Sequence, residues 1–291
     1  MKLKLILSGL IAGFLLAACG SANQEFYGPE EASSQILGGE EVRGDDPLAR
    51  SVVMIGQSGF EDCSATLISE SVGVTAAHCA DPRVTGRAPS PEGFFVKFRS
   101  GKSGLPEADR SVTAFRLPPR WETTAEELRR VLLPRMMDAG WKDWGDIALF
   151  RFEGGLPAGY MPAEIAGPAV PVAVGTPVVL AGFGSRADES LAGPDRGVLR
   201  KVTVNVWAAP AEGIELTFSQ EDGRGSCKGD SGGPAFLARD GKYFLLGSTS
   251  RSVGGVKNNL FELCRQHSVY TDLRRMSDWL KAARAELDAL P

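Results

Sequence analysis

The sequence predicts a mainly antiparallel β protein, either a sandwich or a barrel. Short apolar runs that include β-branched residues recur between Gly, Pro and Asp residues, which is typical of strands separated by turns. No long helices separate these runs, as a parallel α/β sheet would require. The predicted strands are 51–55, 65–68, 73–77, 94–98, 147–152, 177–180, 198–207 and 243–250.

The composition sets the class of protein. The chain has 291 residues, of which 43% are apolar and 23% charged, which excludes coiled coils, collagen, disordered chains and polytopic membrane proteins. Its length suffices for one large domain or two small ones around a substantial core. The 32 basic and 36 acidic residues form no long run of one sign, so we do not expect nucleic acid as a partner.

The N-terminus has the features of an export signal. Lys2 and Lys4 precede an apolar stretch, 5–18, that is too short to span a bilayer comfortably. The stretch ends in Leu-Ala-Ala-Cys19, which resembles a bacterial lipobox, although an ordinary signal peptide containing a Cys is the alternative. We predict a lipoprotein signal peptide over 1–18, a lipidated tether or propeptide over 19–35, and anchoring at the bacterial cell envelope through lipid on Cys19.

The cysteine count agrees with a lipidated Cys19. Five cysteines would leave an odd thiol in an exported protein. If Cys19 carries lipid, four remain, and in an exported chain they most simply form two disulfides. These four are Cys63, Cys79, Cys227 and Cys264. From residue 20 to 34 the composition is small and polar, as in a tether; Gly20 after the lipid-bearing Cys favours the outer membrane in a host that has one.

Two stretches predict helices. Thr123 and Thr124 each offer a capping box, and Leu128, Val131 and Leu132 follow at helical spacing before Pro134. The second helix covers 277–290, where Trp279, Leu280, Ala283 and Leu287 make one apolar face. We expect this terminal helix to pack on the domain without a chemical role.

Three local features suggest chemistry. The chain has only two histidines, and His78 ends an apolar strand beside Cys79, whereas His267 lies in a polar stretch. The Gly-rich segment around Ser231 can expose its hydroxyl and align backbone N–H groups for an oxyanion. Asp146 lies at the start of a strand. Taken singly, each has an ordinary interpretation: a structural histidine, a glycine turn and a strand end.

Taken in order, these features resemble the trypsin-like (chymotrypsin-fold) serine protease family. The matching segments are Thr75-Ala76-Ala77-His78-Cys79, Asp146-Ile147-Ala148-Leu149 and Gly229-Asp230-Ser231-Gly232-Gly233-Pro234. Gly182-Phe183-Gly184 is similar to the family's segment at the start of its second barrel. The resemblance implies an all-β fold of two packed antiparallel Greek-key β-barrels with a C-terminal helix. It places the protease domain at 36–291, with barrel halves of roughly 36–165 and 166–291.

The resemblance also implies an activity and its residues. The chain is expected to be a serine endopeptidase that hydrolyses proteins or peptides through an acyl-enzyme, without a metal or organic cofactor. Ser231 would be the nucleophile, His78 the base and Asp146 its partner, and the N–H groups of Gly229 and Ser231 would form the oxyanion hole. The disulfides implied by the family are Cys63–Cys79 and Cys227–Cys264.

Activation is a further expectation from the resemblance. Ile36-Leu37-Gly38-Gly39 is similar to the N-terminus that cleavage releases in the family, and Asp230 would pair with the new ammonium group. Gln35 precedes this bond, so a trypsin-like activator is not expected to cut it. Cleavage would separate the domain from lipidated Cys19; we therefore expect release on activation, or else an active anchored form in which Asp230 has another partner.

The specificity pocket departs from that of trypsin. The family's pocket floor corresponds to Gly225, in place of the Asp that selects Lys or Arg, and Ser250, Ser252 and Ser268 would line the pocket. We expect a small or uncharged substrate side chain, although Arg251, His267 and the serines leave an acidic one open. The 68 residues from His78 to Asp146 are more than usual, so the predicted helix there either borders the cleft or is a surface elaboration.

Two other functions are compatible with parts of the sequence. Gly229-Asp230-Ser231-Gly232-Gly233 also fits the nucleophile elbow of an α/β-hydrolase esterase, with Asp240 and His267 in the required order. That elbow needs a helix after Ser231, but Gly232, Gly233 and Pro234 lead into a strand-like run. The other alternative is a protease-like binding protein without activity, although such proteins have usually replaced a triad member and none is missing here.

Overall fold

The computed structural model describes residues 36–57, 63–85, 91–99, 103–130, 143–184, 197–253, 264 and 266–290, so the predicted signal peptide, the tether and Cys19 lie outside it. The chain divides into two units, Met1–Ala32 and Ser33–Pro291, and every described residue belongs to the second. None of the helices in these ranges has the length and apolar character needed to cross a membrane.

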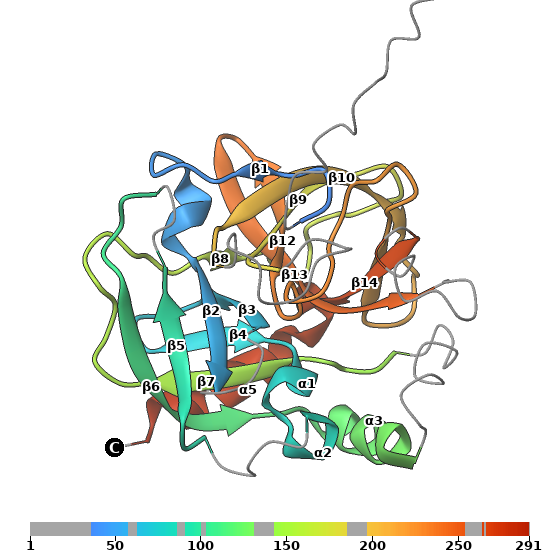
Figure 1. Cartoon of the computed structure of the whole chain (residues 1–291). Coiled ribbons are helices and arrows are strands. Elements are labelled where there is room, and N and C mark those ends of the chain that lie inside the picture. Colours follow the sequence, from blue (N-terminus) through green and yellow to red (C-terminus); the bar gives the residue numbers. More distant parts are fainter. Residues whose placement is uncertain are drawn as a thin grey trace, which may run out of the picture. The chain divides into compact units, whose positions relative to one another are not determined.

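Six antiparallel strands of the first half close into a barrel in the order β2-β3-β4-β7-β6-β5 (Figure 1). In β5 every second residue is buried, as expected where one strand face lines a barrel interior. The strands are β2 Val52–Gln57, β3 Cys63–Leu67, β4 Val72–Thr75, β5 Phe94–Phe98, β6 Ala108–Arg116 and β7 Ala148–Phe152.

The second half forms another barrel, closed by pairing of β9 with both β10 and β12. Its order, β9-β10-β11-β14-β13-β12, follows the same connectivity as the first barrel. The short β1 (Glu40–Glu41) pairs with β10, and β8 (Glu164–Ile165) pairs in parallel with β13. The barrel strands are β9 Pro177–Gly182, β10 Arg200–Ala208, β11 Glu215–Ser219, β12 Pro234–Arg239, β13 Lys242–Val253 and β14 His267–Asp272. This architecture confirms the predicted fold class.

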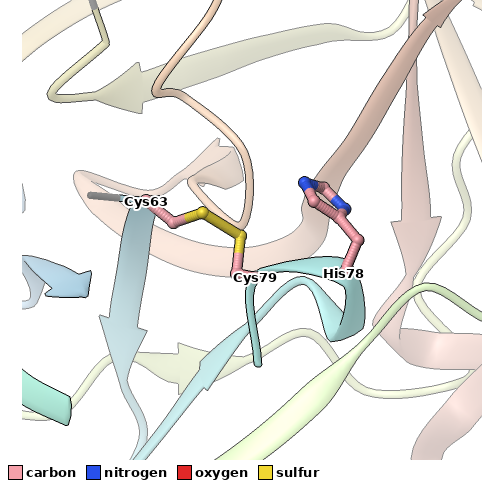
Figure 2. Close-up of side chains that lie close together, drawn as sticks. All are labelled: Cys63, His78 and Cys79. Carbon is pink, nitrogen blue, oxygen red and sulfur yellow. A yellow bond between two sulfur atoms is a disulfide. The ribbon is translucent and has the colours of Figure 1, made fainter. Parts of the chain in front are cut away.

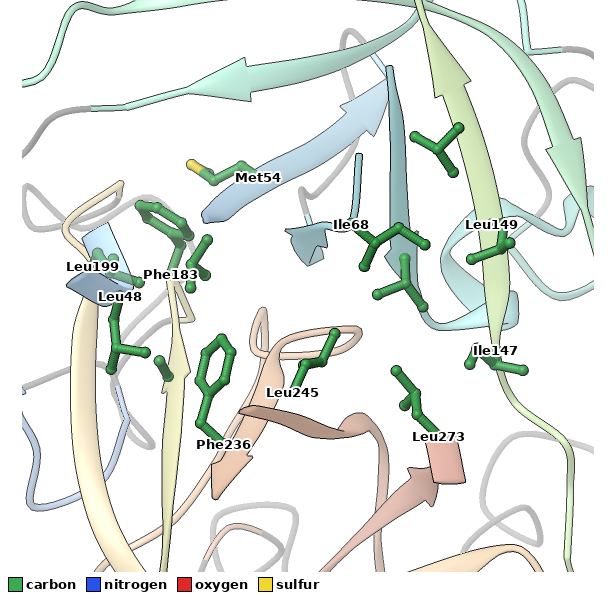
Figure 3. Close-up of a cluster of buried hydrophobic side chains, with 14 of the residues drawn as sticks. Leu48, Met54, Ile68, Ile147, Leu149, Phe183, Leu199, Phe236, Leu245 and Leu273 are labelled. Carbon is green, nitrogen blue, oxygen red and sulfur yellow. The ribbon is translucent and has the colours of Figure 1, made fainter. Parts of the chain in front are cut away.

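Buried apolar side chains form a separate core in each barrel and a third cluster between the barrels. The third cluster joins Met54 and Leu149 of the first barrel to Phe236 and Leu245 of the second (Figure 3). Burial of apolar area is the main force that holds such an interface together. The seam between the two barrels is therefore a fixed scaffold on which loops from both halves can meet.

Helices lie on the first barrel and at the chain end. They are the 3-10 turns η1 Pro47–Arg50 and η3 Leu273–Met276 and the α-helices α1 Ala77–Ala80, α2 Pro82–Thr85, α3 Pro119–Arg130 and α5 Ser277–Asp288. The terminal helix α5 begins at the predicted residue and buries Leu280, Ala283 and Leu287 in the cluster between the barrels. The predicted apolar face therefore packs where expected.

The start of the inserted helix was predicted wrongly. The capping boxes place it at Thr123 or Thr124, but α3 begins at Pro119, a residue that suits the first turn of a helix. The Thr124 hydroxyl donates hydrogen bonds to the backbone carbonyls of Arg120 and Trp144 and does not cap the helix. The predicted contributions of Val131 and Leu132 lie outside the described residues.

Candidate active site

The segment after β4 carries His78 on the one-turn helix α1. The next residue, Cys79, forms a disulfide with Cys63 on β3, and a ring nitrogen of His78 lies within 4.8 Å of both sulfur atoms (Figure 2). The disulfide ties α1 to the barrel, so the backbone of His78 is held at the barrel end. One of the two implied disulfides is therefore present beside the histidine.

Asp146 lies immediately before β7 and is fully buried against His78. Its Oδ2 is 2.7 Å from Nδ1 of the His78 ring, and its Oδ1 accepts a 2.9 Å hydrogen bond from the His78 backbone N–H. The Ser250 hydroxyl donates a third bond of 2.7 Å to Oδ2. Since an ionised carboxylate only accepts, the Nδ1 atom carries the hydrogen and Nε2 is left to accept a proton.

The environment of Asp146 favours its charged form. Burial by itself would raise the pKa of Asp146, but the charge of His78 and the hydrogen bonds from His78 and Ser250 outweigh it. The pKa of this carboxyl therefore lies below its ordinary value, and a carboxylate faces the imidazole near neutral pH. That charge stabilises a protonated His78 ring if the ring takes up a proton.

Ser231 lies in a turn that is fixed on both sides before β12 begins. Its carbonyl accepts from Ser64 N–H at 2.9 Å, and the next residue, Gly232, donates to Thr249 O at 2.8 Å. Gly232 has φ +78°, and a methyl group there would lie 2.0 Å from Thr75 Oγ1 and 2.7 Å from Ala76 N. The serine turn thus touches the residues that lead into His78 so closely that only glycine fits.

Two backbone donors next to Ser231 have no hydrogen-bond acceptor. Across the described part of the chain, neither the N–H of Gly229 nor that of Ser231 donates a hydrogen bond. Both residues are partly exposed, and N–H groups without an acceptor in the protein are available to a ligand or to water. An oxyanion hole made of these two N–H groups remains the prediction from the sequence, and such a site needs donors of this kind.

A cavity of about 170 Å³ opens beside the serine. Ser231 lines it together with Ser250, the residue that also donates to Asp146, and with Ser226, Arg251, Ser252 and Cys264. The second implied disulfide, Cys227–Cys264, borders this cavity. The structure thus brings the sequence-predicted Ser250 and Ser252 to the cavity, and Ser268 is buried on β14 opposite Ser252.

Sequence reasoning missed the partner of Arg251. Glu215 on β11 binds its guanidinium at 2.8 Å through both oxygens and accepts a further 2.8 Å bond from Trp144 N–H. The guanidinium also lies 4.2 Å from the centre of the Trp144 ring. This buried bidentate pair neutralises Arg251. No local motif pointed to Glu215, because the partners are 36 residues apart on separate strands.

His267, the other histidine, is on β14 with its ring centre 4.4 Å from that of Trp207. Asp240, the third residue of the esterase hypothesis, lies exposed at the turn between β12 and β13. After Ser231 the chain enters β12 and not a helix. The α/β-hydrolase alternative is therefore wrong, because its nucleophile elbow requires a strand–turn–helix arrangement in an α/β sheet.

The comparisons with known proteins agree with this geometry. The family model described as Trypsin matches residues 119–280, which is more than half of the chain. The chain belongs to the trypsin family. It is 28% identical to trypsin-1 of Astacus astacus over 85% of this chain and 99% of that protein. Identity to chymotrypsin-like elastase family member 1 of Felis catus is 24%, over 91% of this chain and 94% of the relative.

A further relative is longer than this chain. Vitamin K-dependent protein C of Oryctolagus cuniculus is 28% identical over 90% of the trypsin-family chain, but the match spans only 55% of that protein. The trypsin family model itself begins at residue 119, so His78 lies before its matched range and Asp146 and Ser231 lie within it. The structure, through the contacts of Asp146, links His78 to the matched region.

Asp230 of this trypsin-family chain is fully buried next to Ser231. Its carboxyl oxygens accept from Gly184 N–H at 2.8 Å and Cys227 N–H at 2.9 Å, and the backbone N–H of Ile36 is a third donor. Ile36 itself is buried, and Leu37 pairs with Gly225. The residues expected to act in activation are thus adjacent in the structure.

Asp230 predicts a pH dependence of stability. Burial raises the pKa of Asp230 to about 7, against an ordinary 3.8, although the three backbone hydrogen bonds oppose this. The folded chain therefore binds more protons than the unfolded chain between these pH values, and its unfolding free energy falls as pH rises through this window. The expected loss is about 4 kcal/mol, on the order of 1.4 kcal/mol for each pKa unit.

Urea unfolding of the uncleaved chain at several pH values, compared with Asp230→Asn, measures this effect. The fall should be much smaller in Asp230→Asn, whereas Asp240→Asn at an exposed turn should behave like the wild type. Equal pH slopes for all three proteins would contradict a buried, proton-binding Asp230. If Asp230→Asn does not fold, the protons taken up or released on unfolding of the wild type provide the same measure.

The helix inserted between His78 and Asp146 is packed against the histidine segment. Trp121 of α3 is fully buried, and its Nε1–H donates a 2.7 Å hydrogen bond to Asp81 just after α1. Trp121 and Ala125 form one apolar cluster with Ala77 and Trp144. Within the described residues, α3 therefore supports both the segment that carries His78 and the segment that carries Asp146.

Replacing Trp121 with Ala should lower the unfolding free energy by about 3–5 kcal/mol, since it removes a large buried side chain. Trp121→Phe keeps a buried ring but leaves Asp81 without its indole donor, so it should cost about 1–3 kcal/mol. Urea unfolding measures both changes. Effects below about 0.5 kcal/mol for both variants, as at ordinary surface sites, would show that α3 contributes little to the fold.

Proposed function

We propose that this chain is a serine endopeptidase that cleaves peptide bonds through an acyl-enzyme. One observation carries the proposal: the Ser250 side chain binds the carboxylate of the His78–Asp146 pair and lines the same cavity as Ser231. The membership of the trypsin family supports protein or peptide substrates.

In the proposed reaction, Ser231 Oγ bonds to the carbonyl carbon of the substrate while its proton passes to His78 Nε2. The negative charge that develops on the carbonyl oxygen is stabilised by the N–H groups of Gly229 and Ser231. The C–N bond then breaks, and the proton of Nε2 goes to the leaving amine. Water attacks the ester in the same manner and restores Ser231. Asp146 holds the ring and stabilises its cationic form throughout.

Labelling with a fluorophosphonate tests the proposal. We expect one modified residue, Ser231, as mapped by peptide mass spectrometry, with labelling lost in His78→Ala and retained in His267→Ala. His267→Ala is the matched control because it removes the other histidine. No labelling of folded, processed protein would support the inactive binding protein instead, and labelling that requires His267 would refute the proposed base.

We also propose that the chain is exported and lipid-anchored through Cys19 at the cell envelope. The lipobox-like Leu16-Ala17-Ala18-Cys19 supports this, and these residues lie outside the described structure. Expression in a bacterium fed a clickable fatty acid should label the wild type and not Cys19→Ser. A mature N-terminus other than Cys19 and equal labelling of both proteins would contradict the anchor.

Cleavage before Ile36 is proposed to activate and release the enzyme. The contact of the Ile36 backbone with Asp230 supports it, because a free ammonium at this place would provide a positive charge beside a buried carboxylate. Sequencing the N-terminus of the active species tests the idea. An N-terminus at Ile36 is expected, and an active chain that still begins at Cys19 would refute release.

A further inference from the structure

The cavity beside Ser231 is small. If Ser231 attacks as proposed, the substrate side chain next to the attacked carbonyl must enter this space of about 170 Å³. Pockets for whole ligands usually measure roughly 300–1,000 Å³, so a cavity of this size takes a single side chain. Ser226 and Cys264 are two residues of its wall.

Gln220 joins these two wall residues from behind. Its Nε2 donates to Ser226 O at 3.0 Å and to Cys264 O at 2.7 Å, while its Oε1 accepts from Ser226 N–H at 2.7 Å. The Ser226 hydroxyl lies within 3.3 Å of the same oxygen. The side chain is fully buried and its amide has used both donors and both acceptor positions. Its amide therefore adds a closed, uncharged backing to the cavity.

Gln220 also occupies the space that a side chain at position 225 would need. A methyl group on Gly225 would lie 2.2 Å from Gln220 Oε1 and 2.3 Å from its amide carbon. Even a small side chain at this position would therefore collide with the buried amide. Gln220 therefore excludes side chains at position 225, and the φ of +156° at Gly225 independently disfavours any residue with a side chain.

The charges around the cavity disfavour a cationic substrate. The described wall contains Arg251 and Lys228 and no carboxylate. Arg251 is held by both oxygens of Glu215, so its charge is compensated inside the protein. A Lys or Arg side chain would find no partner in this wall, and burying such a charge unpaired is costly.

We propose that Gln220 is a specificity-determining residue that keeps this cavity short and neutral, so that the enzyme cleaves next to small, uncharged side chains. This inference rests on the proposed function and names the substrate class for it. Gln220 acts through the wall it holds and not through contact with the reacting atoms. Its removal should therefore alter which substrates bind without altering the chemistry at Ser231.

Four proteins test the proposal: the wild type, Gln220→Gly, Gly225→Asp and the double variant. Matched peptide substrates carry Ala, Phe, Lys or Glu beside the scissile bond, and kcat/KM is measured for each. The wild type should favour Ala over Lys and Glu by about 10²-fold or more. Gly225→Asp should not gain Lys cleavage, because Gln220 blocks the new carboxylate, whereas the double variant should gain at least about tenfold.

Fluorophosphonate titration of Ser231 in each protein separates the two proposals. Absence of labelling in the folded, processed wild type would defeat the proposed function. Normal labelling with a wild-type preference for Lys or Glu, or equal Lys cleavage by Gly225→Asp and the double variant, would defeat the role of Gln220. If a variant fails to fold, inhibition of the wild type by peptide boronic acids bearing Ala, Phe, Lys or Glu decides, since only the Ala compound should bind tightly.

Discussion

Replacement of Ser231, of His78 or of both by alanine is expected to lower kcat/KM by nearly the same factor, roughly 10⁴–10⁶. The two groups act as one unit: without the base the hydroxyl is not activated, and without the hydroxyl the base has no proton to accept. Once one of the two residues is replaced, replacing the other therefore lowers kcat/KM little further. Steady-state hydrolysis of a fluorogenic peptide, with the protein concentration fixed by mass, measures these losses.

Asp146→Asn should lower kcat/KM by about 10⁴-fold, although it leaves the shape of the site nearly unchanged. An amide in place of Oδ2 would face the Nδ1–H and favour the wrong tautomer of His78. His267→Ala is the control and should keep most of its activity, since its ring packs on Trp207 away from Asp146. Additive losses for Ser231→Ala and His78→Ala would mean that the two side chains do not act together.

Gly232→Ala adds only one methyl group, but it is expected to lower both the free energy of unfolding and kcat/KM strongly. The residue has φ +78°, which costs a non-glycine residue about 1–2 kcal/mol. The methyl group would also lie 2.0 Å from Thr75 Oγ1 and 2.4 Å from Ser64 O, which adds about 1–3 kcal/mol of overpacking. The turn must move to relieve this contact, so the Ser231 hydroxyl and its neighbouring N–H groups should lose their positions.

Gly223→Ala separates the cost of the backbone conformation from the cost of the steric overlap. Gly223 has nearly the same φ, +77°, but nothing lies within 4 Å of the added methyl group. We expect Gly223→Ala to lose only the free energy of unfolding that a positive φ costs a non-glycine residue, about 1–2 kcal/mol, and to keep its activity. Gly232→Ala should lose about 2–5 kcal/mol in urea unfolding and at least about 10³-fold in kcat/KM. Similar behaviour of the two variants would show that the tight contact with Thr75 does not matter.

The strands that the sequence predicts best are the apolar runs rich in Val, Ile and Phe. The runs at 51–55, 94–98 and 147–152 all became strands, because continuous apolar segments bounded by turns have few other stable arrangements. In contrast, β6 was missed: only Val112 of Ala108–Arg116 is fully buried, and most of the strand is polar. Its pairing with β5 and β7 comes from closure of the barrel and not from its own composition.

The residues of the candidate site also differ in whether the local sequence reveals them. The segments around His78, Asp146 and Ser231 could be recognised because each is a short contiguous motif, and the implied disulfides are both present. Glu215 and Gln220 could not be found, since an acidic or amide residue in an ordinary strand or loop carries no local signal. Their importance depends on partners that the barrel brings to them, Arg251 in one case and Ser226 with Cys264 in the other.

By itself, the sequence determined the strand-rich class, the terminal helix and the identity of the three segments that would carry the chemistry, because periodicity and contiguous motifs are properties of neighbouring residues. Only the tertiary structure decided that Arg251 is neutralised, that Gln220 backs the cavity and that α3 supports the histidine segment. Each of these depends on distances between residues far apart in the chain. Such distances are set when two barrels close and pack, and no local stretch of sequence encodes them.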